Sequence, residues 1–336
     1  MIIPVNLLEQ SYNIVLERGV INNLAPHLNL NRKAFVITDS GVPYEYAKTV
    51  ASQCDEGYIE VIEEGEGSKN FDTYKHLLTV LLERGFTRSD CVIAVGGGVV
   101  GDLSGFVASS YMRGIDFYNI PTTFLSQVDS SIGGKVAIDF CGVKNIIGAF
   151  YQPRCVIIDT NVLSTLDKRQ LSAGIAESIK MAATFDKELF DLLLNTEDFS
   201  KDVDTIIEKS LKIKRDVVEK DPKEKNLRKV LNFGHTIGHA IESANNLNQL
   251  LHGECVGLGM LYMSSPEVKE KIKSALERYS LPTEYKADAS LLMSYVLHDK
   301  KMSGKEITVI FCNEIGTYEM KKIKADEIVN LIEGGR

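Results

Sequence analysis

The amino-acid sequence predicts an α/β domain followed by a helical domain. In the first half of the chain, short strand-like runs alternate with helical runs, which is the pattern of an α/β domain. After about residue 160 the strand-like runs almost cease, and helical patterns separated by Pro222, Pro266 and Pro282 replace them. A chain of 336 residues is long enough for two cores. We therefore expect one domain at residues 1–160 and a second, all-α domain at residues 161–336.

The strands expected in the first half are short, and several end on a polar residue or a glycine. The apolar run at 34–38 is followed by Asp39, and the run at 91–95 leads directly into three consecutive glycines. An amphipathic helix is expected at 71–84. The full set of expected strands is 13–17, 34–38, 58–62, 91–95, 115–120 and 155–158.

The second half is expected to consist mostly of helices, because apolar residues recur there at helical spacing. A strand-like run at 306–311 is the exception. The expected helices cover residues 169–195, 202–220, 227–244, 254–263, 266–279 and 325–333.

Composition narrows the class of protein. Charged residues make up 25% of the chain and hydrophobic residues 44%, which is the mix of a soluble globular protein. The net charge of −8 argues against nucleic acid or an anionic membrane as a partner. No run reaches transmembrane length, no signal peptide is evident, and the six cysteines are scattered without a CxxC pair. We expect a cytoplasmic protein with free thiols.

Three of the six histidines lie in one short segment of the second half. On a helix, Arg228, Asn232, His235 and His239 would share one face, and His252 follows shortly after. One interpretation is a half-buried helix with satisfied core histidines. A face with this many polar groups makes a poor core, and imidazole is a common metal ligand, so a metal-bearing active-site face is favoured. The spacing does not say which histidines bind metal or where a carboxylate ligand comes from.

A glycine-rich turn follows the expected strand at 91–95 and opens a helical pattern. Glycines there let the backbone approach a diphosphate, and a helix N-terminus presents N–H donors. The spacing alone is weak evidence, since glycine turns also serve packing, but its place between strand and helix favours a nucleotide site. Asp39 suits a ribose hydroxyl, although a turn or helix N-cap role explains it equally well.

The segment 121–150 is dense in hydroxyls, glycines and lysines, with Lys135 and Lys144 among them. Such a loop suits anion or polyol binding, and a plain solvated loop is the alternative. In the second half, Glu177 and Lys180 lie three residues apart. This spacing usually means a surface ion pair. Here the flanking residues are apolar, so the carboxylate needs a partner, and a metal would serve.

Nine motifs, in one order along nearly the whole chain, resemble 3-dehydroquinate synthases. They are GEGSK (65–69), GGGVVGD (96–102), RGIDF (113–117), IPTT (120–123), VDSSIGGK (128–135), KNIIGAFYQP (144–153), AGIAESIK (173–180), RKVLNFGHTIGHAIE (228–242) and LHGE (251–254). The resemblance implies an NAD-binding α/β domain joined to a helical metal-binding domain, with the active site between them.

The resemblance also implies roles for particular residues. Zinc or cobalt would be held by Glu177, His235 and His252. NAD contacts are implied for Asp39, Glu66, Lys69, Gly97, Gly98, Asp102, Thr122, Thr123, Lys135, Lys144 and Thr165. Substrate contacts are implied for Asp129, Lys135, Asn145, Lys180, Lys214, Arg228, Asn232 and His239, and for either Lys300 or Lys301.

The implied reaction converts 3-deoxy-D-arabino-heptulosonate 7-phosphate, a phosphorylated sugar acid, to 3-dehydroquinate and phosphate, with NAD regenerated in each turnover. A homodimer is implied as well. The alternatives are another sugar phosphate cyclase, a metal-dependent polyol dehydrogenase of the same superfamily, or a module that binds without catalysis. Two departures stand out. The helical segment after Met260 is short, and Asp139 stands where asparagine is expected.

Overall fold

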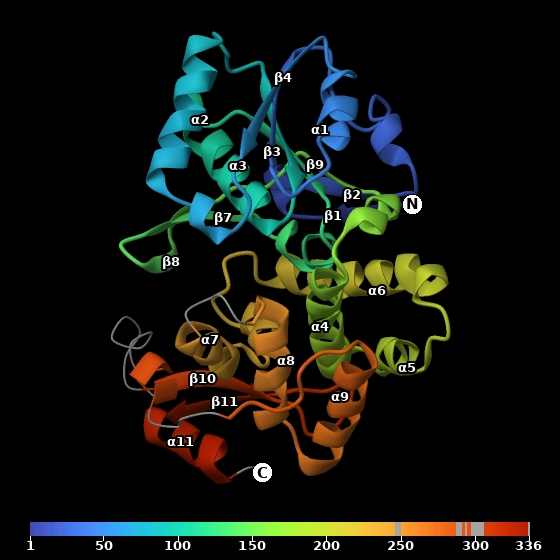
Figure 1. Ribbon diagram of the computed structural model, residues 1–336, viewed down its shortest axis with the longest axis vertical. Helices are drawn as coiled ribbons and strands as arrows, with labels where there is room; N and C mark the ends of the chain where they lie inside the picture. Colours follow the sequence, from blue (N-terminus) through green and yellow to red (C-terminus); the bar gives the residue numbers. More distant parts are fainter. Residues whose placement is uncertain (246–249, 287–290, 293, 297–305, 335–336) are drawn as a thin grey trace. The chain divides into compact units, whose positions relative to one another are not determined.

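The computed structural model describes the whole chain except residues 246–249, 287–290, 293, 297–305 and 335–336. The chain divides into two compact units, Met1–Leu166 and Asp167–Arg336. The first unit carries a mostly parallel sheet with helices, and the second is largely helical (Figure 1). The predicted order of an α/β part and then a helical part is confirmed. The division follows Leu166, where the expected boundary was residue 160.

A seven-stranded sheet forms the centre of the first unit, with the strand order β1-β2-β9-β6-β5-β3-β4. Neighbouring strands are parallel, except for the antiparallel pair of β1 and β2 at one edge. The strands are β1 (Ile2–Val5), β2 (Tyr12–Leu16), β3 (Lys33–Asp39), β4 (Glu56–Ile62), β5 (Cys91–Gly96), β6 (Asp116–Pro121) and β9 (Cys155–Ile158).

Both faces of this sheet are buried, which explains the continuous apolar runs in the sequence. In β3, Ala34 and Val36 join a core beneath α1 (Tyr44–Ala51). Phe35 and Ile37, on the opposite face, join a core with α2 (Phe71–Glu83) and α3 (Gly98–Ser110). The side chain of Asn70 begins α2 by accepting the Thr73 N–H at 2.9 Å.

The direction in which successive strands of the chain are added to the sheet reverses at β3. This strand pairs with β4 on one side and with β5 on the other, so the chain leaves β3 toward one edge and resumes at β5 toward the opposite edge. The carboxyl ends of these parallel strands carry Asp39 and the glycine turn at Gly96. Ligands of such sheets bind at this topological switch point.

The prediction of a loop at 121–150 is wrong, because most of this segment forms regular secondary structure. A single π-helical turn spans Ser126–Ser130, and β7 (Lys135–Phe140) pairs with β8 (Val143–Phe150) in an antiparallel hairpin. The two turn residues Cys141 and Gly142 both have positive φ, 51° and 78°. This conformation matches the twist of a two-residue hairpin turn. The many glycines and hydroxyls of the segment concealed the alternation of its strands.

The second unit contains mainly helices, together with one antiparallel strand pair. The sequence predicted β10 but not its partner. The elements are α4 (Lys168–Phe185), α5 (Lys187–Asn195), α6 (Phe199–Lys220), α7 (His235–Ala244), α8 (His252–Tyr262), α9 (Pro266–Arg278), β10 (Glu306–Phe311), β11 (Glu319–Lys324) and α11 (Ala325–Gly334).

Two of the expected helices are interrupted. The helix expected at 169–195 breaks at Asp186, whose side chain accepts the Leu189 N–H and begins α5. The helix expected at 227–244 is wrong in its first half. A 3₁₀ helix occupies Leu227–Asn232, and α7 begins only after Gly234, whose φ of 79° is left-handed.

Glycines bring three helices of the second unit into close contact. A Cβ atom on Gly253 would lie 1.8 Å from the carbonyl oxygen of Ala173 in α4. A Cβ atom on Gly259 would lie 1.9 Å from the carbonyl oxygen of Gly234, just before α7. Only residues without a side chain allow α8 to pack this closely against both neighbours, and this packing brings the amino-terminal ends of α7 and α8 toward the middle of α4.

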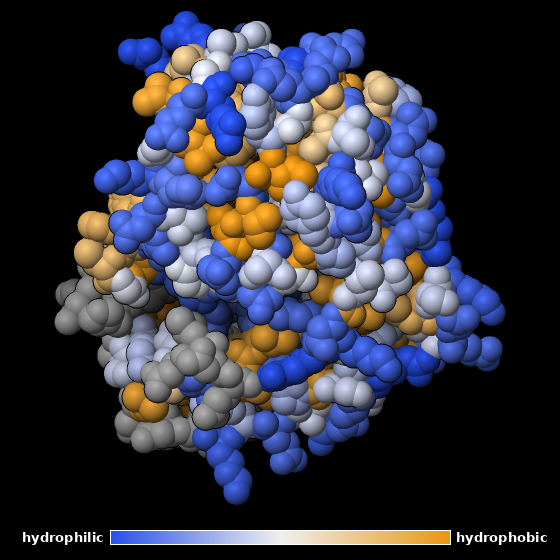
Figure 2. Space-filling view, turned by 45° about the horizontal axis from the view of Figure 1, so that its top comes forward, coloured by the Kyte–Doolittle hydropathy of each residue, from blue (hydrophilic) through white to orange (hydrophobic). Residues whose placement is uncertain are grey.

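The face drawn in Figure 2 carries hydrophobic residues in small groups among hydrophilic ones. Across the part of the chain that the structure describes, every helix is too short or too polar to cross a bilayer.

Candidate metal and nucleotide sites

A carboxylate and two imidazoles converge in the second unit. Glu177 lies in the middle of α4, while His235 and His252 are the first residues of α7 and α8. The Nε2 atoms of His235 and His252 lie 3.7 and 3.5 Å from Oε1 of Glu177. The ligating atoms of His235, His239 and His252 also lie within 4.8 Å of one another. The geometry therefore offers four groups of the types that bind a divalent metal.

The carboxylate of Glu177 is the most unusual of these groups. It is 1% exposed, and neither oxygen accepts a hydrogen bond from the residues that the structure describes. The ammonium of Lys180 forms an ion pair with Oε2, while Oε1 lies beside the two imidazoles. Burying a carboxylate without hydrogen bonds is costly. A cation held between Oε1 and the two Nε2 atoms would supply the missing interaction, so the donor set fits a metal.

The outer nitrogens of the two histidines are already engaged. Nδ1 of His235 lies 3.1 Å from the carbonyl oxygen of Phe233, and Nδ1 of His252 lies 3.1 Å from Oε2 of Glu242. Each acceptor favours a proton on Nδ1, which leaves the Nε2 lone pair toward Glu177. Histidines that bind metals commonly show this arrangement.

The two imidazoles differ electrostatically. Burial, reinforced by the nearby Lys180 ammonium, holds the pKa of His235 well below its usual value. This keeps the ring neutral, which is the form that ligates a metal. Burial also disfavours a charge on His252, but the carboxylates of Glu177 and Glu242 outweigh it and raise its pKa to about 9 in the metal-free site. His252 must therefore release its Nε2 proton when it binds a metal. His239 is exposed, and its ring centroid lies 5.2 Å from that of His235.

The prediction of one shared helix face is wrong. It placed Arg228, Asn232, His235 and His239 on a single helix. The break at Gly234 separates the first two from α7, so only the histidines share a helix face. Arg228 is buried and donates from Nη1 to the carbonyl oxygen of Pro222 at 2.9 Å. Asn232 is exposed and donates from Nδ2 to Oε1 of Glu224 at 2.9 Å.

The other residues of the second unit that were expected to contact the substrate are lysines. Lys214 on α6 is buried, and so is Lys180, beside Glu177. Burial of lysine is uncommon and requires compensating contacts. Lys300 and Lys301 lie outside the described residues.

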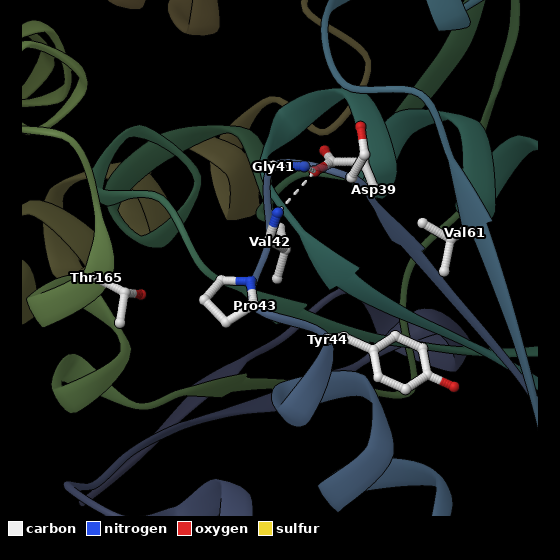
Figure 3. A pocket seen from close by; sticks show the side chains of 8 residues that line it. Asp39, Gly41, Val42, Pro43, Tyr44, Val61 and Thr165 are labelled. Carbon is white, nitrogen blue, oxygen red and sulfur yellow. Dashed lines mark hydrogen bonds between the residues drawn. The ribbon is translucent and has the colours of Figure 1, made fainter.

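The first unit has a pocket of about 460 Å³ at the ends of β3 and β4 (Figure 3). Asp39 and Val61 line it from the ends of β3 and β4, and Thr165 lines it from the opposite side. Oδ1 of Asp39 accepts the N–H groups of Gly41 and Val42 at 3.0 and 3.1 Å. Asp39 therefore has the turn role that the sequence allowed, and it also lines a pocket.

The glycine-rich turn follows β5, the strand that pairs with β3 on the side opposite β4. Gly97 precedes α3 as its N-cap in an extended conformation, and Thr122 donates its N–H to Gly96 at 2.9 Å. A Cβ on Gly97 would lie 3.0 Å from Cγ2 of Thr123. The turn thus packs closely against the end of β6. It also presents the free N–H groups of the first turn of α3.

Lys69 is a buried lysine that contacts residues expected to bind the nucleotide and one residue, Asn145, expected to bind the substrate. Lys69 is 3% exposed, and its Nζ lies 2.9 Å from Oδ2 of Asp102 and 3.4 Å from Oε1 of Glu66. It also donates to Oδ1 of Asn145. Burial lowers the pKa of Lys69, but the carboxylates of Asp102 and Glu66 outweigh it and raise the pKa above its ordinary value.

The other polar candidates of the first unit follow β6. Asp129 lies in the π-helical turn, Lys135 begins β7, and Lys144 lies on β8. Both lysines are exposed.

Sequence reasoning missed Glu242. A signal was present, because Glu242 lies seven residues after His235, two helical turns along the same face of α7. The contact that gives it a role comes from α8, and helical spacing does not reveal which helix lies opposite.

Two solved structures are similar to the whole chain. The 2-deoxy-scyllo-inosose synthase complexed with carbaglucose-6-phosphate, NAD+ and Co2+ has a TM-score of 0.87 and 25% identity, with 100% of both chains covered. The 2-epi-5-epi-valiolone synthase of Streptomyces hygroscopicus, with NAD+ and Zn2+ bound, has the same TM-score and identity over 97% of both chains. The fold and the carboxylate–histidine cluster therefore place the chain in the class of sugar phosphate cyclases.

The sequence comparisons narrow this class. The family model described as "3-dehydroquinate synthase N-terminal" matches residues 59–173, and the one described as "3-dehydroquinate synthase C-terminal" matches residues 174–302. A 3-dehydroquinate synthase of Campylobacter concisus is 40% identical over an alignment of 347 positions, which covers 99% of each chain. The chain belongs to the 3-dehydroquinate synthase family.

Proposed function

We propose that the protein converts 3-deoxy-D-arabino-heptulosonate 7-phosphate to 3-dehydroquinate and phosphate, the second step of the shikimate pathway. Near-full-length identity of 40% to named 3-dehydroquinate synthases supports this reaction. The observation that carries the proposal is the convergence of two Nε2 atoms on Oε1 of the buried Glu177 carboxylate.

In this proposal Glu177, His235 and His252 hold a divalent metal, zinc or cobalt. The burial of Glu177 and the orientation of both half-buried imidazoles support this ligand set over one that includes the exposed His239. His239 then remains beside the metal, where it can move a proton to or from substrate. The solved relatives with Co2+ or Zn2+ bound are consistent with such a site.

NAD is proposed to bind at the switch point of the first unit. Asp39 would accept a ribose hydroxyl through its second carboxylate oxygen, since Oδ1 already accepts two backbone N–H groups. The first turn of α3 would face the diphosphate. Further contacts are proposed for Glu66, Lys69, Gly97, Gly98, Asp102, Thr122, Thr123, Lys135, Lys144 and Thr165.

When bound, NAD supplies a reversible hydride acceptor and the metal supplies a Lewis acid for a hydroxyl oxygen. The chain's own residues would bind and orient the substrate. Lys180, Lys214 and Arg228 are buried cations suited to substrate phosphate or carboxylate oxygens. Asp129, Lys135, Asn145 and Asn232 would contact its hydroxyl and acidic groups. Hydride transfer to bound NAD would leave a ketone on the substrate and acidify the neighbouring C–H, so phosphate could leave by elimination before the hydride returned.

We further infer a homodimer in the cytoplasm. Both follow from the family resemblance, and the composition of the chain is compatible with them.

A substrate panel tests the proposed reaction. Purified protein with NAD and Zn2+ is given 3-deoxy-D-arabino-heptulosonate 7-phosphate or glucose 6-phosphate, and the products are identified by mass spectrometry and NMR. The proposal predicts 3-dehydroquinate and phosphate from the first compound only. A carbocycle formed from glucose 6-phosphate instead would indicate the activity that the name of the solved 2-deoxy-scyllo-inosose synthase suggests. Net NADH formation from glycerol would indicate a polyol dehydrogenase.

A further inference from the structure

Three residues of the first unit form a closed ring of hydrogen bonds. Asp139 donates its backbone N–H to the carbonyl oxygen of Lys69 at 2.7 Å. Oδ1 of Asp139 accepts the backbone N–H of Asn145 at 2.7 Å. Oδ1 of Asn145 in turn accepts from Nζ of Lys69. Each member thus restrains the other two, and the ring links the end of the 3₁₀ turn at Glu66–Ser68 to both strands of the β7–β8 hairpin.

The backbone of Asn145 needs such a restraint. Its φ is 53°, in the left-handed region that residues other than glycine rarely adopt. Asparagine tolerates this conformation better than most residues, but in the middle of a strand it still costs about 1 kcal/mol or more. Asp139 lies across the hairpin and is half-buried, and its carboxylate accepts the N–H that this conformation turns away from the strand pairing.

The ring also fixes which end of the Asn145 amide faces outward. An ammonium group only donates hydrogen bonds, so the atom that faces Lys69 must be the amide oxygen. The Nδ2 group is therefore turned away from Lys69, and no acceptor contacts it among the described residues. Asn145 is exposed at this point, so its NH₂ group is presented as a donor to an oxygen of a bound molecule.

We propose that Asp139 is a positioning residue that holds Asn145 in the conformation in which its amide donates to an oxygen of the substrate. This inference rests on the proposed function, in which Asn145 contacts substrate. Asp139 itself does not touch substrate in this account. Because Lys69 also pairs with Asp102, we expect loss of the Asp139 carboxylate to affect substrate binding and to leave NAD binding nearly unchanged.

A double-mutant cycle with a conservative variant tests this role. In the full-length protein loaded with NAD and Zn2+, Asp139→Ala is expected to lower kcat/KM for 3-deoxy-D-arabino-heptulosonate 7-phosphate about tenfold, mainly through KM. Asp139→Asn retains an oxygen that can accept the Asn145 N–H and is expected to stay within about threefold of wild type. In an Asn145→Ala background, Asp139→Ala is expected to have little further effect. The dissociation constant of NAD should change less than threefold.

Two controls separate this role from a general loss of structure. Asp72→Ala removes an exposed aspartate at the start of α2 and should leave kcat/KM unchanged. Equal losses for Asp139→Asn and Asp139→Ala, or an undiminished loss in the Asn145→Ala background, would overturn the proposal.

Hydrogen exchange tests the ring without any activity. The amide of Asn145 should exchange slowly in wild type and in Asp139→Asn, and faster in Asp139→Ala. Unchanged exchange in Asp139→Ala would overturn the inference even if the enzyme is active. Failure of wild type to release phosphate would instead count against the proposed function, and the exchange result would still decide whether Asp139 positions Asn145.

Discussion

Nδ1 of His252 lies 3.1 Å from Oε2 of Glu242, and Nε2 of the same ring faces Glu177 at 3.5 Å. One imidazole thus joins a carboxylate on α7 to a carboxylate on α4. The contact with Glu242 holds a proton on Nδ1, so Nε2 is the nitrogen that would lose its proton and bind a metal in the candidate site.

Removing this support should weaken the metal site. We expect Glu242→Ala to lower the affinity for Zn2+ about 10- to 100-fold, the range typical for partners of ligating histidines. Glu242→Gln keeps an acceptor for the Nδ1 proton and should lie closer to wild type. Competition with a chromophoric chelator measures the affinity, and Glu267→Gln, on an exposed glutamate of α9, is the control. An unchanged affinity in Glu242→Ala would show that the contact does not orient the ligand.

The buried pair of Glu177 and Lys180 predicts a stability effect in the metal-free protein. Glu177→Gln leaves the Lys180 ammonium buried without its countercharge. Breaking such a pair costs about 3–5 kcal/mol. Urea unfolding of the metal-free protein should show this loss. Glu188→Gln breaks the exposed pair with Lys209 and should cost less than about 1 kcal/mol. Equal small losses in both variants would contradict the predicted cost of burial.

Close helix packing predicts that α8 tolerates no side chain at Gly253. In Gly253→Ala, the new Cβ would meet the carbonyl oxygen of Ala173 at 1.8 Å, so α8 must move away from α4. We expect a loss of about 3 kcal/mol in the free energy of unfolding and weaker Zn2+ binding. Gly67→Ala is the stability control, because a Cβ there meets no atom within 4 Å. A Gly253→Ala protein as stable as wild type would show that the contact is not tight.

The lowered pKa of Asp116 should make the free energy of unfolding depend on pH. Burial tends to raise its pKa, but hydrogen bonds from Arg32 and Arg154, both at 2.7 Å, outweigh it and lower the pKa below its ordinary value. The folded state therefore binds fewer protons, and this stabilisation is present above about pH 4 and lost as pH falls through the lowered pKa.

The variant Asp116→Asn should show this dependence. We expect it to lose roughly 1 kcal/mol at pH 7, a modest value because the carboxylate is 28% exposed and partly screened. The difference from wild type should shrink as the pH approaches 3, measured by urea unfolding across pH. A difference that stays constant with pH would rule out a charge effect.

Much of the fold could be predicted from residue patterns, because the strands of the parallel sheet are buried on both faces and appear as apolar runs. The β7–β8 hairpin was not predicted, because β8 is almost entirely exposed and its sequence VKNIIGAF does not alternate apolar and polar residues. The start of α7 was misplaced for a different reason. Helical spacing continues through Gly234, and only the left-handed φ of that residue reveals the break.

The prediction of the metal-binding residues from the sequence was limited in a similar way. Spacing along one helix identified His235 and His239 but did not separate ligand from neighbour. The proposed ligand set depends on α4 and α8, which supply Glu177 and His252, and on the contact of His252 to Glu242. Which helices meet depends on contacts such as Gly253 against Ala173. Contacts of this kind leave no periodic signal in the sequence.

The most direct test of the central claim follows phosphate and NADH together in one sample. The protein is stripped of metal, loaded with NAD, and given 3-deoxy-D-arabino-heptulosonate 7-phosphate before and after Zn2+ is restored. We expect phosphate release only with the metal, and no accumulation of NADH in the near-ultraviolet absorbance. Absence of phosphate release with both NAD and Zn2+ bound, or NADH accumulating in step with turnover, would contradict this expectation.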